Sequence, residues 1–339
     1  MINKLKERLF ALSNADGIGS ICEASDLAFD MLSEYCETEK TDNLTVIGIL
    51  KGEDNYTLML DAHIDQVGFV VTSVDDKGFL TVKNVGGIDI RSLPSRRVTV
   101  HGKEKVTAVF CSTPPHLAKG EVSFHNISDI KLDTALGKKA KETVSVGDYV
   151  TFENSPKELL GNRVCGRSFD NRTAVDCLIT VAEMLSDKKL PFNVAFVLSD
   201  GEELGLRGIR TASFKIDPQE AIAVDVSFGD AIGISSDECS PLGSGAMIGM
   251  APTLDSEISK KLISIGKDKN INYTAEVMGG KTGTNADMIS VNKEGVRTCT
   301  VSIPLRNMHT DTEVVDILDL ESVCNLLCEY VLSGGVKGV

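Results

Sequence analysis

The second half of the sequence alternates short apolar strands with helices, and this alternation constrains the fold more than any other feature. Apolar residues at helical spacing predict a helix from Ala174 to Leu185, and further helices near Ile258 and from Ile317 to Val331. Between the helices lie continuous apolar runs, at Val194–Leu198, Ala221–Val224 and Thr298–Ile303. Strands that are apolar on both faces are typical of a parallel sheet covered by helices. The sequence therefore predicts an α/β fold with a mostly parallel central sheet flanked by helices.

The first 66 residues extend the same fold. Two helices are expected within residues 1–40, the second with apolar residues at helical spacing from Ala24 to Tyr35. Two β runs follow, at Leu44–Leu50 and Tyr56–Leu60. Because 339 residues exceed what a single hydrophobic core usually holds, roughly 250–300 residues, a second domain is expected within the chain.

The stretch from Val67 to Val164 has the pattern of a small β domain. Its short β runs are separated by turns that contain glycine. Two hairpins are predicted, Phe69–Val74 with Phe79–Lys83 and Arg97–Val100 with Val106–Cys111. We therefore predict a catalytic domain formed by residues 1–66 and 165–339. Residues 67–164 are predicted to form an inserted small β-barrel, or PDZ-like, domain.

Side chains that can bind metal ions follow four of the predicted strands. They are His63 and Asp65 after the strand ending at Leu60, Glu202 and Glu203 after Leu198, Asp225 after Val224, and His309 after Ile303. Asp170 opens a predicted helix. Open α/β sheets bind ligands beyond the carboxyl ends of their strands, so these groups are expected to meet at one edge. Each residue alone would be an ordinary loop or helix-cap residue. However, the chain has only five histidines, and two of them stand at these positions.

Two histidines with three carboxylates suit a pair of zinc-like ions. One carboxylate must bridge the ions, since two cations roughly 3.5–4 Å apart repel each other and require shared negative charge. Asp65 is well placed to orient the imidazole of His63. The adjacent side chains of Glu202 and Glu203 diverge, so one can bind a metal ion while the other acts as general base. The remaining histidines are predicted to be structural: His101, His116 and His125.

Stretches around these residues resemble the tetrahedral, or TET-type, aminopeptidases, a family that includes glutamyl and deblocking aminopeptidases and has carried endoglucanase labels. The stretches run nearly from end to end of the chain, in the same order. They are DAHIDQVGFVV from Asp61, VGGIDIRSLPSRRVTVHG from Val85, STPPH from Ser112, GNRVCGRSFDNR from Gly161, GEELGLRG from Gly201, AIAVDVSFGD from Ala221 and IPLRNMHT from Ile303. The resemblance implies a zinc-peptidase-like fold. It also implies hydrolysis of the N-terminal residue of peptides by two divalent ions, with a metal-bound hydroxide as nucleophile.

The resemblance further implies a role for each residue. The implied metal ligands are Asp170 as the bridge, His63 and Asp225 at one site, and Glu203 and His309 at the other. Glu202 would be the general base, and Asp65 the supporting carboxylate. Zinc is the expected metal, with cobalt or manganese as alternatives. The resemblance also implies a twelve-subunit tetrahedral shell assembled largely through the inserted domain, which is also expected to control access to the site.

Three positions depart from the family pattern. Gln66 stands where Glu usually follows the His-x-Asp sequence, and Asn285 replaces a common Asp in GKTGTNAD. The segment SFGDAIGISS after Val226 lacks a usual Pro. Because none of these is a metal or base position, we expect Gln66 to tune the site and Asn285 to alter the substrate pocket or its support.

Three other functions compete with the aminopeptidase. A metal-dependent carboxypeptidase or deacylase has a similar order of ligands, but its extra domain usually follows the Glu-Glu pair. Here the β region separates His63 from Asp170, 107 positions apart (170 minus 63). An endoglucanase needs two carboxylates that flank the scissile bond, but the absence of Trp and 5% aromatic residues leave little for sugar stacking. A non-catalytic peptide-binding or assembly module would not require a complete set of ligands together with a base.

Charge and composition exclude several classes of binding partner. The net charge of -14 argues against binding to nucleic acid or to an anionic membrane. No apolar run approaches the ~18 residues of a membrane helix, and the apolar run Leu9–Leu12 is too short for a signal peptide. Nine cysteines without a Cys-x-x-Cys pair predict reduced thiols. We therefore expect a cytoplasmic homo-oligomer that acts on peptides with a free N-terminus and binds neither nucleic acid nor membrane.

Overall fold

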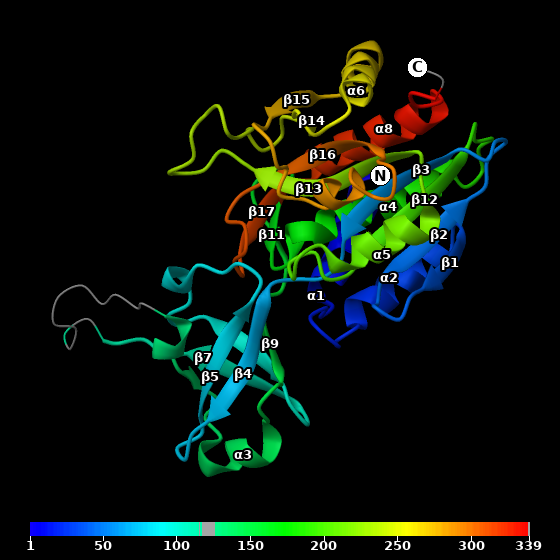
Figure 1. Cartoon of the computed structure of the whole chain (residues 1–339). Helices are drawn as coiled ribbons and strands as arrows, with labels where there is room; N and C mark the ends of the chain where they lie inside the picture. The colour runs from blue at the N-terminus through cyan, green and yellow to red at the C-terminus, as the bar shows by residue number, and fades with distance from the viewer. Residues whose placement is uncertain (115, 117–125, 338–339) are drawn as a thin grey trace.

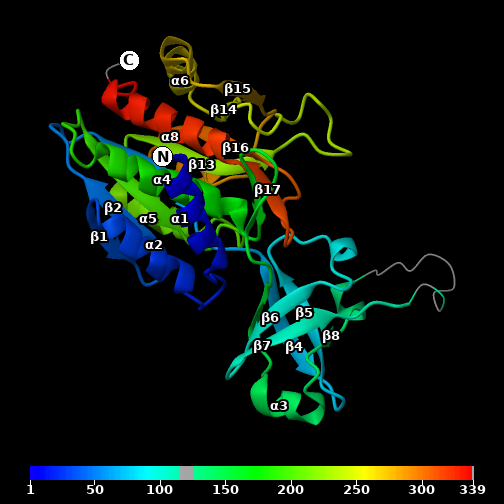
Figure 2. The same ribbon diagram turned by 180° about the vertical axis from the view of Figure 1, so that it is seen from behind.

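The computed structural model describes residues 1–114, 116 and 126–337, and it consists of a large α/β part and a smaller β-barrel (Figures 1 and 2). The α/β part is built on an eight-stranded sheet. In spatial order its strands are β1 (Glu37–Lys40), β2 (Val46–Leu50), β12 (Asn193–Ser199), β3 (Thr57–His63), β13 (Glu220–Phe228), β16 (Arg297–Leu305), β14 (Ala246–Met250) and β15 (Tyr273–Val277).

The four central strands of this sheet, β12, β3, β13 and β16, are all parallel. The strands on either side join them by antiparallel pairing, β2 to β12 and β14 to β16. The predicted α/β fold with a mostly parallel sheet is therefore confirmed. The sequence patterns did not predict β1, β14 or β15, which lie towards the sheet edges.

Helices cover both faces of the sheet. One face packs against α1 (Ile2–Asn14), α2 (Glu23–Ser33), α4 (Phe169–Leu185), α6 (Ser256–Lys269) and α8 (Ile317–Leu332). The other face packs against α5 (Arg207–Ile216) and α7 (Ala286–Ile289). In β12, Val194 and Phe196 belong to the first core, whereas Ala195 and Val197 belong to the second. This two-sided burial explains the continuous apolar run of the strand.

The inserted part closes into a six-stranded barrel, as predicted. The strands follow the order β4 (Gly68–Val74), β5 (Phe79–Val85), β8 (Leu132–Asp133), β7 (Lys105–Phe110), β6 (Arg97–His101) and β9 (Tyr149–Phe152). Both predicted hairpins, β4–β5 and β6–β7, are present and antiparallel. Phe69 centres the barrel core, with the rings of Phe110 and Phe152 at 5.0 and 5.5 Å in edge-to-face contact. The connections contain η1 (Ile90–Ser92), η3 (Ile127–Asp129), η4 (Gly137–Lys139) and α3 (Ala140–Thr143).

Two features join the barrel to the α/β part. A small sheet of β10 (Lys157–Glu158), β11 (Arg163–Gly166) and β17 (Glu313–Asp316) connects the chain returning from the barrel with the C-terminal region. The buried carboxylate of Asp16 accepts hydrogen bonds from Thr151 at 3.0 Å and Lys105 at 3.1 Å in the barrel, and from Arg167 at 2.7 Å in the α/β part. These charge-assisted bonds hold the two parts together.

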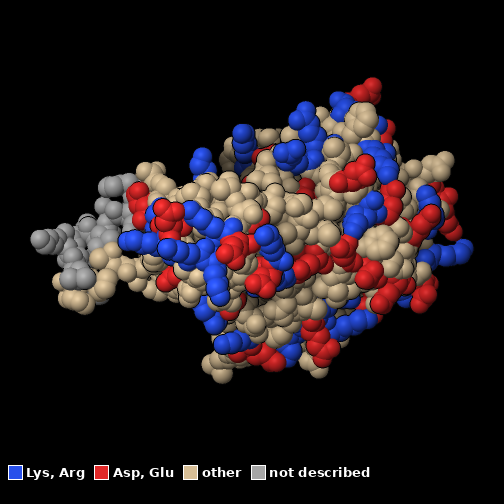
Figure 3. All heavy atoms as spheres, turned by 90° about the horizontal axis from the view of Figure 1, so that it is seen from below, with Lys and Arg blue, Asp and Glu red and all other residues tan. Residues whose placement is uncertain are grey.

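The remaining expectations concern histidines, cysteines and surface charge. His101 contacts Thr151 at 2.9 Å, His116 is exposed, and His125 lies outside the described residues. All nine cysteines are free thiols. On the face shown in Figure 3, basic and acidic side chains are interspersed. In the part of the chain that the structure describes, no helix combines the length and apolarity needed to cross a bilayer.

Candidate metal centre

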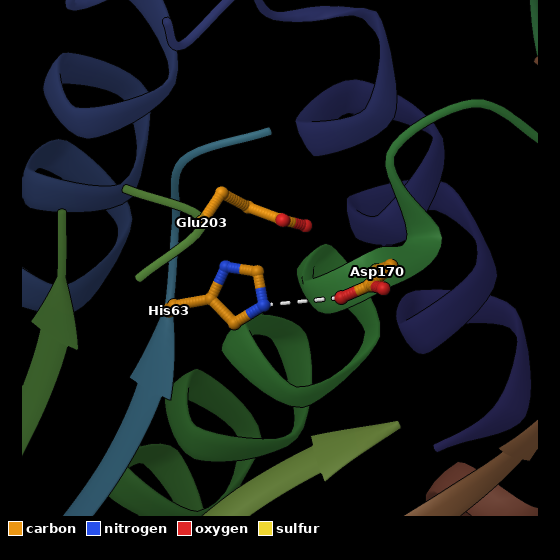
Figure 4. Close-up of side chains that lie close together, drawn as sticks. All are labelled: His63, Asp170 and Glu203. Atoms are coloured by element: carbon orange, nitrogen blue, oxygen red, sulfur yellow. Dashed lines mark hydrogen bonds and ion pairs between the residues drawn. The ribbon is translucent and has the colours of Figure 1, made fainter. Parts of the chain in front are cut away.

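The carboxyl ends of the four central strands carry the side chains that the sequence analysis selected. His63 is the last residue of β3, Asp225 lies in the second half of β13, Glu202 and Glu203 follow β12, and His309 follows β16. Asp170 reaches the same edge from the first turn of α4. Figure 4 shows the side chains of His63, Asp170 and Glu203 pointing towards one another. The structure therefore brings together residues from five distant segments of the chain.

Asp170 lies between the two histidines. Its Oδ1 atom is 3.0 Å from His63 Nε2, and its Oδ2 atom is 3.2 Å from His309 Nε2. His63 Nε2 is also 3.8 Å from Asp225 Oδ1, and His309 Nε2 is 3.1 Å from Glu203 Oε1. The side chains thus form two groups, one around His63 and one around His309, and each group faces a different oxygen of Asp170.

Asp65 organises the loop that follows β12. Its two carboxylate oxygens accept hydrogen bonds from the backbone N–H groups of Glu202 and Glu203, at 2.9 and 3.1 Å. Asp65 Oδ1 is also 3.4 Å from His63 Nδ1. One buried carboxylate therefore fixes the backbone of both glutamates and faces the ring nitrogen of His63 that points away from Asp170.

The sequence analysis missed Glu313. This buried residue opens β17 and accepts hydrogen bonds from the backbone N–H groups of Asp170, at 3.1 Å, and His309, at 2.8 Å. His309 has a φ of 60°, a left-handed conformation that a residue with a β-carbon rarely adopts. Glu313 therefore helps to hold His309 in this conformation. One feature of the sequence could have pointed to Glu313: it is a carboxylate four positions after His309, at the start of a short strand.

The site concentrates negative charge. Six carboxyl groups surround two imidazoles: Asp65, Asp170, Glu202, Glu203, Asp225 and Glu313. Among residues 1–114, 116 and 126–337, no Lys or Arg forms an ion pair with these six groups. Excess buried carboxylate without a basic side chain calls for bound cations, and imidazole and carboxylate are ligands that zinc-like ions accept. The residues therefore fit a metal site.

The pKa values reflect this charge imbalance. Burial raises the pKa of Asp225 and Glu313 well above the usual carboxylate range. Burial, together with the negative charges of Glu203, Asp65 and Asp170, raises the pKa of Glu202 to about 7, although His63 opposes this shift. Burial alone would lower the pKa of His309, but hydrogen bonds to Asp170 and Glu203 outweigh it and raise this pKa to about 11.

A hollow of about 480 Å³ opens onto these residues. Its lining includes His63, Asp170, Glu202, Glu203, Asp225 and His309. The rest of the lining consists of Val226–Phe228, Lys281–Thr284 and Met308. The hollow is large enough for one end of a peptide chain.

The departures from the family pattern lie beside the site. Gln66 Oε1 accepts hydrogen bonds from Gly17 N, at 3.1 Å, and from Arg172, at 3.4 Å, so Gln66 braces the N-terminal segment. Asn285 Nδ2 donates to Asp61 at 2.7 Å and to Ser199 at 2.8 Å. Asn285 therefore lies in the support beneath the strand ends and does not line the hollow.

A mostly parallel sheet whose carboxyl edge gathers carboxylates and imidazoles, together with a β-barrel, is the architecture of a metal-dependent peptidase. The chain belongs to the M42 glutamyl aminopeptidase family, whose model matches residues 45–326. It is a hydrolase, an aminopeptidase, as the sequence predicted. This assignment favours the predicted activity over the deacylase and the non-catalytic alternatives.

Curated and solved relatives are similar over nearly their whole length. A lysyl aminopeptidase from Pyrococcus furiosus is 29% identical over 89% of this chain and 88% of its own. An aminopeptidase structure from Desulfurococcus kamchatkensis has a TM-score of 0.92, with 28% identity over 100% of this chain and 99% of its own. The TET1 peptidase from Pyrococcus horikoshii, described as assembling into a tetrahedron or a large octahedral shell, has a TM-score of 0.86. It is 27% identical over 97% of this chain and 99% of its own.

Proposed function

We propose that this aminopeptidase holds two divalent ions, with zinc as the first candidate and cobalt or manganese as alternatives. Asp170 would hold both ions, with His63 and Asp225 at one site and Glu203 and His309 at the other. The division of the side chains into two groups around Asp170 is the observation that supports this assignment. Such ions, when bound, polarise a peptide carbonyl and lower the pKa of water.

Glu202 is proposed as the general base. It lines the hollow and forms no ion pair among the described residues, so its carboxylate is placed to accept and return a proton. Glu202 takes the proton of the attacking water and delivers it to the leaving amine. Asp65 keeps Glu202 in place through the backbone N–H and orients His63.

The proposed substrates are peptides with a free N-terminus. The carboxylates in the lining of the hollow suit the positively charged amine of a peptide end, and Val226–Phe228 and Met308 add apolar lining for the side chain. Family membership supports the same class of substrate.

Removal of metal tests the proposed function. Exhaustive chelation is expected to abolish hydrolysis of aminoacyl chromogenic substrates, because the six carboxyl groups then lack the cations that the chemistry requires. Adding zinc, cobalt or manganese is expected to restore activity. Metal content should be measured by elemental mass spectrometry on each sample. Full activity in a sample shown to be free of metal would refute the metal mechanism.

We also propose a cytoplasmic homo-oligomer, with a tetrahedral dodecamer as the specific assembly and the barrel as its main contact element. The free thiols agree with a reducing compartment, and the TET1 relative supports a shell. Replacing residues 67–164 with a short linker is expected to give smaller particles by light scattering. If the shortened protein folds and still forms a particle with the subunit number of the full-length protein, the barrel is not the assembly element.

A further inference from the structure

The barrel segment 85–97, with the sequence VGGIDIRSLPSRR, supplies no metal ligand and no base, yet it lies against the metal centre. The segment leaves β5 through Gly86 and Gly87, passes through η1 and enters β6. Two of its residues, Gly86 and Gly87, lie against the group formed by Glu203 and His309, and a third, Arg96, pairs with Asp311 in the loop that carries His309. The other group, around His63 and Asp225, is carried by the central strands themselves.

Gly86 lies against Glu203. A β-carbon built on Gly86 would lie 3.0 Å from Glu203 Oε2 and 2.7 Å from a methyl group of Val67. Gly86 also has a φ of 79°, which favours glycine. A side chain at this position would therefore require Val67 to shift and would crowd the carboxylate of Glu203.

Gly87 lies against His309. A β-carbon built here would lie 3.4 Å from His309 Nδ1 and 3.6 Å from Cε1, on the side of the ring away from the Nε2 atom that faces Asp170 and Glu203. Larger side chains at this position would have to displace the imidazole. The two glycines thus set how far Glu203 and His309 extend towards the barrel.

Arg96 holds the loop that carries His309. This loop connects β16 to β17, and its buried Asp311 lies 3.2 Å from Nη1 of Arg96. The backbone carbonyl of Asp311 accepts a further hydrogen bond, at 2.7 Å, from Asn154 in the chain leaving the barrel. A left-handed His309 depends on such contacts, because the conformation is unfavourable without them.

We propose that Gly86, Gly87 and Arg96 are positioning residues for the metal site formed by Glu203 and His309, so that the barrel supports this half of the catalytic centre from outside the hollow. The inference rests on the proposed two-metal function. It adds that the barrel sets the affinity of one metal site and leaves the other unchanged.

Metal titration of the full-length, metal-depleted protein tests this inference. Zn²⁺ binding should be followed by calorimetry, and bound metal counted by native mass spectrometry. Gly86→Ala and Gly87→Val are expected to weaken one of the two binding steps about 10–100-fold, the usual effect of disturbing the support of a metal ligand. Arg96→Ala is expected to weaken the same binding step about tenfold, the lower end of this range. The other binding step should stay within about threefold of wild type, since His63 and Asp225 lie on the central strands and the shared ligand Asp170 lies on α4, outside the barrel.

Two matched variants control for general destabilisation. Gly147 lies in the same barrel with a φ of 98°, and nothing lies within 4 Å of a β-carbon built on it. Gly147→Ala therefore introduces similar backbone strain without touching the metal centre. Arg91 lies in the same segment, but its side chain is 87% exposed and pairs with Asp89. Both Gly147→Ala and Arg91→Ala should bind two ions as wild type does.

The outcomes separate the two proposals. If wild type binds two ions and Gly86→Ala, Gly87→Val and Arg96→Ala all bind the second within about threefold of wild type, the positioning role is wrong. If Gly86→Ala does not fold, Gly87→Val and Arg96→Ala decide the result, because Gly87 needs no left-handed backbone and Arg96 is partly exposed. A wild-type protein that binds fewer than two ions refutes the two-metal function and this inference with it.

Discussion

Replacing Glu202 with Gln is expected to leave both metal ions bound and to lower kcat about 10²–10⁴-fold, the usual effect of losing a general base. The substitution keeps the shape of the side chain, and the backbone N–H that donates to Asp65 is unchanged. Purified Glu202→Gln protein should be assayed with an aminoacyl chromogenic substrate, and its metal content measured on the same sample.

The neighbouring Glu203→Gln variant is the matched control. Glu203 lies 3.1 Å from His309 Nε2, so its neutralisation should weaken metal binding as well as activity. If Glu202→Gln loses metal while Glu203→Gln retains two ions, the roles of the two residues must be exchanged. An active Glu202→Gln enzyme would eliminate Glu202 as the base.

Replacing Asp170 with Asn is expected to lower activity as much as Glu202→Gln does, or more, but through the loss of bound metal. In the described part of the chain, Asp170 is the one carboxylate that lies within 4 Å of the Nε2 atoms of both histidines. An amide offers one oxygen and no negative charge, so two neighbouring cations would lose the group that they share. We expect at most one tightly bound ion per subunit and a fall in kcat/KM of at least about 100-fold.

Asp176→Asn provides the comparison for this second prediction. Asp176 is a fully buried carboxylate of the same helix, α4, but it pairs with Arg8 and does not line the hollow. Its neutralisation should reduce thermal stability and leave two ions per folded subunit. An Asp170→Asn protein that still binds two ions as tightly as wild type would refute the bridging role.

A simple geometric rule explains why the sequence could predict that most of the candidate metal-centre residues lie at one edge of the sheet. Parallel strands end at one edge of a sheet, so polar residues after apolar runs must converge there. The rule placed His63, Asp225 and His309 at the same edge of the sheet without any knowledge of the distances between them. The rule could not show that the two oxygens of Asp170 face different histidines, because that depends on where α4 lies relative to the sheet.

Other parts of the structure depend on long-range contacts that local patterns do not contain. Glu313 lies in β17, which pairs with β11 across a large sequence separation, so its proximity to Asp170 has no local signal. The strands β1 and β15 contain polar and exposed residues and lack the apolar run that identified β12. The contact between Gly87 and His309 depends on how the barrel lies against the α/β part, a relation fixed by Asp16 and its partners.

The order of the strands also determines when the enzyme becomes active during its synthesis. β16, a central strand of the sheet, is also its last strand along the chain, and it precedes His309 and Glu313. At about 5–20 residues per second, a ribosome exposes His63 well before these residues. A nascent chain, or one truncated before β16, therefore carries four of the five proposed ligands but lacks His309 and a central strand of the sheet. We expect such a chain to be inactive, because the group formed by Glu203 and His309 is incomplete.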